Sequence, residues 1–280
     1  MPTPEIPQFF SDPLTAAGLM ALAAQAGYYS LYWFLGDRAH RQHAAEGFER
    51  VLVSGVLFGV ALILINLSLW GLNTYLSVAG VKLPYNSAIQ VLNQTKSWQD
   101  FGANVQTALS TAASTYQSYV GAAWDILAGY MAVVIGTGVL PWTSPVSMAV
   151  MNAYAYIVTA ATTILISAAV YAVAAAMAYS WPALLPVGAV LVTYERTRNL
   201  GAWLLALSVV APVVLAAGAD VLKSAVDPSK LPRLDTATPS GAVSLIQAMT
   251  LLGLVGLVLS VLSYAASRLF DHAGAHLALD

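Results

Sequence analysis

The sequence has no cysteine and very little charge. Charged residues make up 9% of the 280 positions, whereas a soluble domain carries roughly a quarter. So few charges do not suffice to cover a water-facing surface, and without cysteine the chain forms neither disulfides nor thiolate metal sites. The net charge of −2 gives no overall field that attracts nucleic acid. Composition therefore argues against a soluble domain and against a strongly basic nucleic-acid-binding protein.

The sequence also lacks the short motifs of common catalytic chemistry. It contains no phosphate-binding GxxxxGK[ST] loop, no HExxH zinc motif, no nucleophile elbow and no CxxC pair. The four histidines form two pairs, His40 with His43 and His272 with His276, which we interpret as solvated polar ends rather than a shared metal site. We therefore predict no catalytic residue, no cofactor and no metal site, and we do not expect an enzyme.

Long apolar runs dominate what is present. Hydrophobic residues form 59% of the chain, and the mean hydropathy is +0.71. Because about 20 consecutive apolar residues cross a bilayer as a helix, the sequence predicts an all-α fold. We expect a polytopic transmembrane helix bundle, a single domain over residues 1–280, that spans the cell (cytoplasmic or inner) membrane several times. Six or seven spans are predicted, at about residues 11–35, 51–77, 119–140, 147–179, 184–194, 200–222 and 242–266.

Two polar stretches separate the early spans. Residues 36–50 read as a polar loop, and residues 79–118 form a long polar excursion. We predict a short amphipathic helix in the first half of the excursion and the Ser/Thr-rich beginning of the third span in the second half. Lys and Arg favour the cytoplasmic side, and their distribution weakly favours seven spans with the N-terminus outside. Both topologies place the excursion outside the cytoplasm, where the Asn93-Gln94-Thr95 sequon is compatible with that side.

Small residues and prolines mark candidate packing and break positions. Gly55 and Gly59 have the spacing that lets another helix backbone approach closely. The run at 184–194 is short and rich in helix breakers, so it is a short span, a half-helix or a re-entrant segment. The predicted helix-break positions are Pro182, Pro186, Gly188 and Pro212.

Few ionisable residues fall within or beside the predicted spans. Asp125, in GAAWDILAGY, is the one we expect to lie within a span, where it would either line a water path or sit near the interface. Glu195, Arg196 and Arg198 form a compact polar turn, in which Glu195 can pair with Arg198. This turn is either a functional site or a cytoplasmic loop that orients the protein.

One stretch carries a family resemblance. Residues 185–222, LPVGAVLVTYERTRNLGAWLLALSVVAPVVLAAGADVL, resemble the TrbL-type polytopic channel subunits of type IV secretion and conjugation systems. Archaeal members, including the membrane subunit of the crenarchaeal DNA-exchange (Ced) import system, are similar in length and composition. The matching residues are Pro186, Gly188, Thr197, Arg198, Leu200, Gly201 and Ala202.

The resemblance implies a membrane subunit of a DNA-transfer or DNA-import channel. Such a subunit would belong to a hetero-oligomer with other membrane subunits, including pilin-like proteins, and with a cytoplasmic ATPase, and single-stranded DNA would pass in transit. Its other contact would be membrane lipid. The family dictates no catalytic residues.

Two other function classes remain open. A stand-alone transporter of small solutes or ions needs a binding site at a broken helix, and a structural or assembly protein needs no transport path. The polar residues of the spans discriminate between them, because a shared lumen favours transport and scattered helix contacts favour a scaffold. These residues are Gln25, Asn66, Asn73, Asp125 and Asn152.

Overall fold

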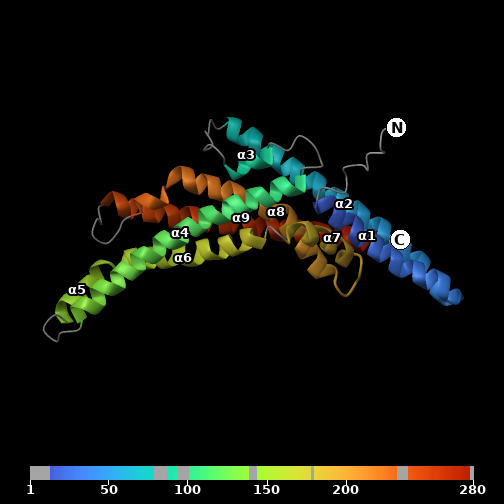
Figure 1. Cartoon of the computed structure of the whole chain (residues 1–280), viewed down its shortest axis with the longest axis horizontal. Helices are drawn as coiled ribbons and strands as arrows, with labels where there is room; N and C mark the ends of the chain where they lie inside the picture. Colours follow the sequence, from blue (N-terminus) through green and yellow to red (C-terminus); the bar gives the residue numbers. More distant parts are fainter. Residues whose placement is uncertain are drawn as a thin grey trace, which may run out of the picture.

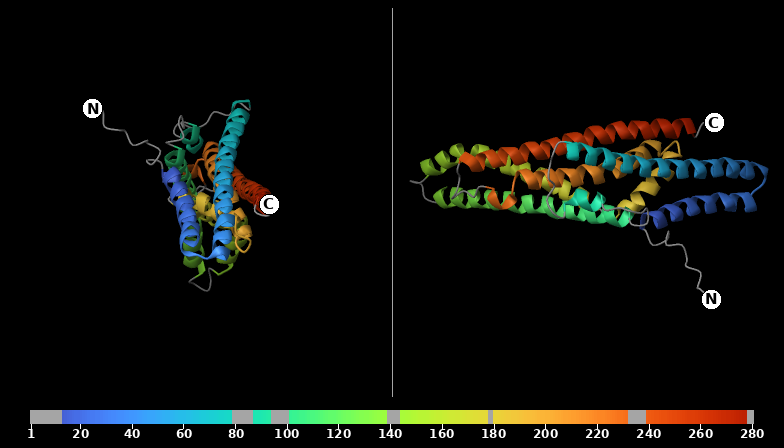
Figure 2. Two further views of the ribbon diagram at one scale, coloured as in Figure 1. Left: turned by 90° about the vertical axis from the view of Figure 1, so that its right-hand side faces the viewer. Right: turned by 90° about the horizontal axis from the view of Figure 1, so that it is seen from above.

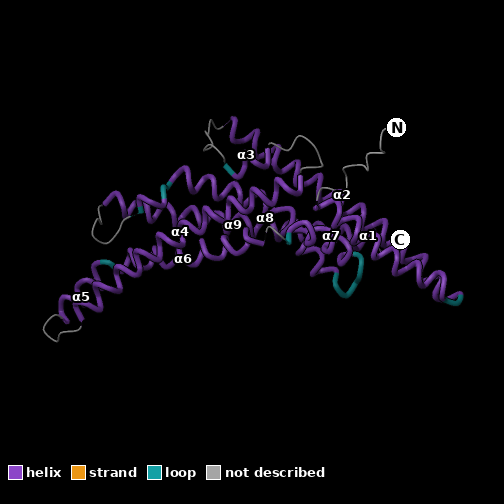
Figure 3. Tube along the Cα trace, in the orientation of Figure 1, coloured by secondary structure: helices purple, strands orange, loops and turns teal. Residues whose placement is uncertain are grey.

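The computed structural model describes residues 13–78, 87–93, 101–138, 144–177, 180–231 and 239–277. Within these ranges the chain is almost entirely helical and no strand occurs (Figure 3). The predicted all-α fold is therefore confirmed. The helices in chain order are α1 (Pro13–Leu35), α2 (Arg38–Val78), α3 (Ala88–Asn93), α4 (Phe101–Gly138), α5 (Ser144–Ala153), α6 (Ala155–Ala176), α7 (Trp181–Val192), α8 (Arg198–Ala225), the 3₁₀ turn η5 (Pro228–Lys230) and α9 (Pro239–Leu277).

The helices run roughly along one long axis (Figure 1, Figure 2). The α1–α2 hairpin extends past the α7–α8 turn at one end, and the α4–α5 hairpin forms the other end. Helix α8 lies in the middle and packs against α2, α4, α7 and α9. In the most apolar stretch of α8, 61% of the residues are buried, a larger share than in any other membrane-length helix described. The core of the bundle is therefore built around α8.

Five of the described helices are long and apolar enough to cross a membrane: α2, α4, α6, α8 and α9. The protein is a multi-pass membrane protein. The predicted count of six or seven adds α1 and α7, which do not reach this criterion. Helix α1 has 23 residues, but the Gln25 and tyrosine side chains of α1 lower the mean hydropathy of the helix. Helix α7 has only 12 residues.

Residues 38–50 of the polar stretch are helical, which corrects the prediction of a loop over 36–50. Only Gly36 and Asp37 separate α1 from α2. The Asp37 carboxylate accepts a hydrogen bond from the His40 amide (3.1 Å) and lies 2.7 Å from His40 Nδ1. This side-chain contact holds the pKa of the Asp37 carboxyl below its usual value. Ala44 is buried on the same helix, so the polar residues are the exposed face of a helix rather than a loop.

The excursion and the fourth span are confirmed in part. The predicted amphipathic helix is α3, which buries Ile89 and Leu92, and the Ser/Thr-rich stretch is the first half of α4. Gln94 and Thr95 of the sequon lie outside the described residues, as do the side chains of Asn93 and Asn73. The fourth span is divided at Tyr154 into α5 and α6. Helical hydrogen bonding continues across this division: the Tyr154 amide donates to the Val150 carbonyl (3.0 Å).

Helices α4 and α6 pack along a regular seam. Seven residues of α6 are buried, and six of them, all except Ala160, follow one another at alternate spacings of four and three positions, which is the periodicity of coiled-coil packing. Five of these six are alanine or isoleucine. These residues are Ile157, Ala161, Ile164, Ala168, Tyr171 and Ala175.

Helices α1 and α2 meet through glycines other than those predicted. A Cβ on Gly55 would lie 3.9 Å from Leu22 Cδ1, and a Cβ on Gly59 would meet nothing within 4 Å. A Cβ on Gly18 would lie 2.7 Å from Phe58 Cζ. Within the described residues no backbone approaches Gly55 or Gly59 closely, and their role in helix packing stays a prediction.

Candidate functional site

Residues 185–222 fold into the helical hairpin α7–α8. Gly188 of α7 and Gly201 of α8 lie where the two helices cross. A Cβ on Gly201 would lie 2.4 Å from the Val192 nitrogen, and a Cβ on Gly188 would lie 2.9 Å from the Leu205 nitrogen. Both obstacles are backbone atoms, so only glycine permits this approach. The hairpin is therefore a rigid unit in which two backbones touch.

Helix α7 is continuous from Trp181 to Val192. Pro182 lies in its first turn, in agreement with a helix boundary at this position. Pro186 and Gly188 do not break the helix, so the prediction of a break at these two residues is wrong. Pro186 removes one hydrogen bond near the start of the helix, and Gly188 serves the crossing with α8. The hairpin turns instead at residues 193–197, where Thr197 Oγ1 donates to the Leu191 carbonyl (2.9 Å).

Pro212 lies inside α8, and the helix continues through it. A proline has no N–H, so the Ser208 carbonyl four residues earlier receives no bond from the helix ladder. The indole Nε1 of the buried Trp181 donates to this carbonyl (2.8 Å). Trp181 therefore satisfies the acceptor that Pro212 leaves free, which explains how α8 tolerates a proline in the core.

This pairing predicts a dependence between two substitutions. Trp181→Phe should destabilise the protein by about 1.5 kcal/mol, because the buried Ser208 carbonyl loses its donor. In a Pro212→Ala background the alanine N–H supplies the missing bond, and the same substitution should then have an effect near zero. Thermal unfolding of the four purified variants in one detergent would give the coupling free energy. Equal effects of Trp181→Phe in both backgrounds would contradict the pairing.

A polar cluster joins α1 and α2 to the α7–α8 turn. Tyr29 and Tyr194 share a hydrogen bond between their hydroxyls (3.0 Å), and Gln25 Nε2 lies 3.4 Å from the Tyr194 hydroxyl and 3.5 Å from Thr193 Oγ1. The guanidinium of Arg50 sits over the Tyr194 ring, 5.7 Å from its centroid. Gln25 is 5% exposed and its Oε1 has no partner. We call the site formed by this cluster and residues 195–198 the polar corner.

The three charged candidates of the turn lie in this polar corner. Glu195 and Arg196 are exposed, and Arg198 is half-buried. The predicted ion pair between Glu195 and Arg198 does not form. Within the described ranges the one ion pair joins His40 to Asp37. The Arg198 Nε atom is buried without an acceptor. The turn therefore presents cationic groups whose counter-charge the described chain does not supply.

Asp125 lies on the outer surface of α4. Its side chain is exposed and faces a hollow of about 390 Å³ between α4 and η5. Ser118, Gly121 and Ser229 also line this hollow. Asp125 makes no ion pair within the described residues. It is not brought together with the polar corner, which lies at the other end of α8.

Among the residues that the structure describes, the one buried carboxyl group is that of Asp220, which we did not predict as a functional residue. Asp220 is 4% exposed. Its two oxygens accept the backbone N–H groups of Ala88 (2.9 Å) and Ile89 (2.8 Å), so it caps α3 from a distant helix. The sequence signal was present: Asp220 follows an uninterrupted apolar run and precedes the end of α8. Its partners are not predictable from spacing.

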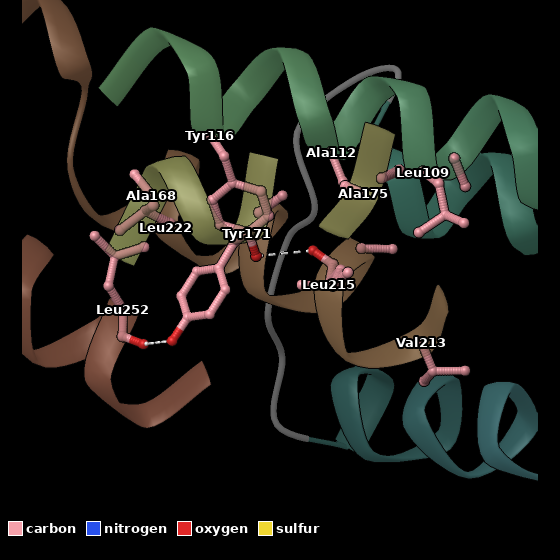
Figure 4. Packing of buried hydrophobic residues seen from close by; sticks show 14 of the residues in the cluster. Leu109, Ala112, Tyr116, Ala168, Tyr171, Ala175, Val213, Leu215, Leu222 and Leu252 are labelled. Atoms are coloured by element: carbon pink, nitrogen blue, oxygen red, sulfur yellow. Dashed lines mark hydrogen bonds between the residues drawn. The ribbon is translucent and has the colours of Figure 1, made fainter. Parts of the chain in front are cut away.

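Buried tyrosines tether the helices through backbone carbonyls (Figure 4). The Tyr116 hydroxyl donates to the Leu215 carbonyl (3.0 Å), and the Tyr171 hydroxyl donates to the Leu252 carbonyl (2.9 Å). A Cβ on Gly256 would lie 2.2 Å from the Tyr171 oxygen, so this glycine makes room for the contact. Helices α4 and α6 are thereby bonded to α8 and α9.

The histidines do not take part in a metal site within the described part of the chain. Within the described residues no group of three His, Cys, Asp or Glu side chains is arranged to hold a metal ion. His40 stacks on Tyr32, with ring centroids 5.8 Å apart.

Comparison with protein-family models, with curated proteins and with solved structures finds no match.

Proposed function

We propose that this protein is a membrane subunit of a DNA-transfer or DNA-import channel of the type IV secretion kind, energised by a partner ATPase. One observation carries the proposal that it works inside an assembly. The first half of α4 exposes a polar face on a helix that is otherwise apolar enough to cross a membrane. We call this surface the hydroxyl face. Its exposed residues are Ala103, Thr107, Ser110, Ser114, Gln117, Ser118 and Gly121.

The hydroxyl face suits contact with another protein. Each exposed serine or threonine donates to a carbonyl of its own helix, for example Ser114 Oγ to Thr111 (2.8 Å). Such back-bonded hydroxyls are tolerated at membrane depth and keep acceptor lone pairs for a neighbouring helix or for water. Small residues on the same face allow that neighbour to approach.

The arrangement of the other polar residues supports a stand-alone transporter less well. Gln25 is buried against the α7–α8 turn, and the Asn66 amide bonds the Leu62 carbonyl of its own helix (2.9 Å). Asp125 and Asn152 are exposed on α4 and α5. These four do not line one lumen, and α7 is not broken at Pro186 or Gly188. The transporter remains the alternative, with Asp125 as its candidate ion partner, and a structural or assembly role is the further alternative.

The resemblance of residues 185–222 supplies the proposed cargo and partners. The sequence contains no nucleotide-binding motif, so the energy for transfer would come from an ATPase. That partner would dock at the end where α1 and α2 extend past the α7–α8 turn, because this end presents exposed polar residues such as Arg38 and Arg41 (Figure 1). Pilin-like and other membrane subunits would contact the hydroxyl face.

Affinity purification of the tagged chain from its native membrane in a gentle detergent tests this function. Recovery of a secretion-type ATPase and small pilin-like proteins is expected. A Ser110→Leu/Ser114→Leu variant should retain the thermal stability of the natural chain, since both side chains are exposed, and should recover at least about tenfold less of these proteins.

Val170→Leu, an exposed substitution on α6, is the matched control and should not alter recovery. Isolation of the natural chain alone, as a homogeneous monomer or dimer, would favour the transporter. Recovery of membrane proteins without an ATPase would favour the assembly role.

A further inference from the structure

Three arginines of the polar corner have no carboxylate partner among the described residues. Arg50 belongs to α2, Arg196 to the α7–α8 turn and Arg198 to the first position of α8. Neither Arg50 nor Arg198 is fully exposed, and none of the three forms an ion pair with any residue that the structure describes. Glu195 lies beside two of them in sequence, yet it points to solvent. The corner therefore has an excess of positive charge that the described fold leaves unmatched.

Two of these arginines are held in place rather than free. The Arg50 guanidinium rests over the Tyr194 ring, which itself is bonded to the Tyr29 hydroxyl. The Arg198 Nε atom is buried and lacks an acceptor. A buried donor without a partner is destabilising, so such atoms in native proteins are normally matched by a group outside the chain when none is inside.

The corner lies at the level where the apolar runs begin. Val51 follows Arg50 directly on α2, and Leu200, which is 58% exposed, follows Arg198 by two positions on α8. Tyr28 and Trp203 are also exposed close by in the sequence of α1 and α8. Arginine and aromatic side chains at the ends of apolar helices mark the headgroup level of a bilayer.

We propose that the polar corner binds the phosphate headgroup of an anionic phospholipid from the adjacent leaflet. The planar guanidinium groups of Arg50 and Arg198 match phosphate oxygens in pairs of hydrogen bonds. A phosphate oxygen is the acceptor for the buried Arg198 Nε, and the acyl chains lie along exposed aliphatic residues such as Leu200. These aliphatic neighbours favour a lipid over a nucleic-acid phosphate, which would remain in water. Bound lipid would fix α2 against the α7–α8 hairpin.

Lipid titration of the full chain in detergent tests the site. Dioleoyl phosphatidylglycerol should raise the midpoint of thermal unfolding by about 5 °C or more at saturation, whereas dioleoyl phosphatidylcholine should not. Native mass spectrometry should show a retained phosphatidylglycerol molecule. Arg50→Gln/Arg198→Gln should lose both the shift and the retained lipid, and each variant's midpoint without lipid gives its own baseline.

Arg268→Gln is the matched control, because that guanidinium bonds the Tyr264 hydroxyl of its own helix (3.1 Å) and is exposed on α9. It should keep the full shift. Equal effects of the two lipids, or equal losses in Arg268→Gln and the double variant, would overturn the proposal. A shift of the same size with inorganic phosphate, or displacement of the lipid by a single-stranded oligonucleotide, would also overturn it in favour of a free-anion or nucleic-acid site.

Discussion

Replacing Gly201 with alanine should destabilise the protein by about 3 kcal/mol, or about 6 °C or more in thermal unfolding. The added Cβ would lie 2.4 Å from the Val192 nitrogen, 2.7 Å from the Leu191 carbonyl carbon and 2.9 Å from the Gly188 oxygen. All three are backbone atoms of α7, so no side-chain rotation relieves the contact. Helices α7 and α8 would have to separate, although a turn of five residues joins them.

Gly59→Ala is the control for this prediction. A Cβ there meets nothing within 4 Å, and alanine is the better helix former. Its midpoint of thermal unfolding should equal or exceed that of the natural chain. A loss of similar size in both variants would show that the glycine crossing is not what holds the hairpin. Loss in Gly201→Ala alone would locate the rigid unit in the α7–α8 hairpin.

Replacing Asp220 with alanine is expected to have the second large effect, a loss of about 3 kcal/mol. The substitution leaves the N–H groups of Ala88 and Ile89 without acceptors in a buried position and removes the cap of α3. Asp220→Asn keeps one oxygen acceptor and should lie between the natural chain and Asp220→Ala. Because the cap joins α3 to α8, amide hydrogen exchange in α3 should accelerate more than exchange in α6.

Asp125→Ala is the matched control, since Asp125 is exposed and makes no ion pair within the described residues. Its unfolding midpoint should change by no more than about 0.5 kcal/mol in free-energy terms. If Asp125→Ala proved as damaging as Asp220→Ala, the capping role of Asp220 would not explain the loss. Unchanged exchange in α3 of Asp220→Ala would contradict the tie between α3 and α8.

These two aspartates show where sequence reasoning stops. Both are isolated acids in apolar helical sequence, and the pattern around Asp125 gave it the stronger claim to burial. The structure buries Asp220 instead, because α3, whose Ala88 lies 132 positions away, brings two N–H groups to its carboxyl. A carboxyl group is buried only where such donors meet it, and a linear pattern does not reveal them.

The glycines show the same limit. The spacing of Gly55 and Gly59 indicates a small-residue face but not which helix approaches it. Close backbone contact occurs at Gly188 and Gly201, which lie on different helices and follow no spacing rule within either. The breaking residues also act differently in the folded chain, because Trp181 supplies the hydrogen bond that Pro212 removes.

The sequence by itself determined that the chain is all-α and built from membrane-length helices, and it located α3 and the polar first half of α4. Composition and local periodicity suffice for these features, because apolar burial and helix formation depend on residues close in sequence. Only the tertiary structure decided that 38–50 is helical, that Asp220 rather than Asp125 is buried, and that Arg50 of α2 lies over Tyr194 in the turn that carries Arg196 and Arg198. Those outcomes depend on which distant groups supply the hydrogen bonds and charges that a buried polar atom requires.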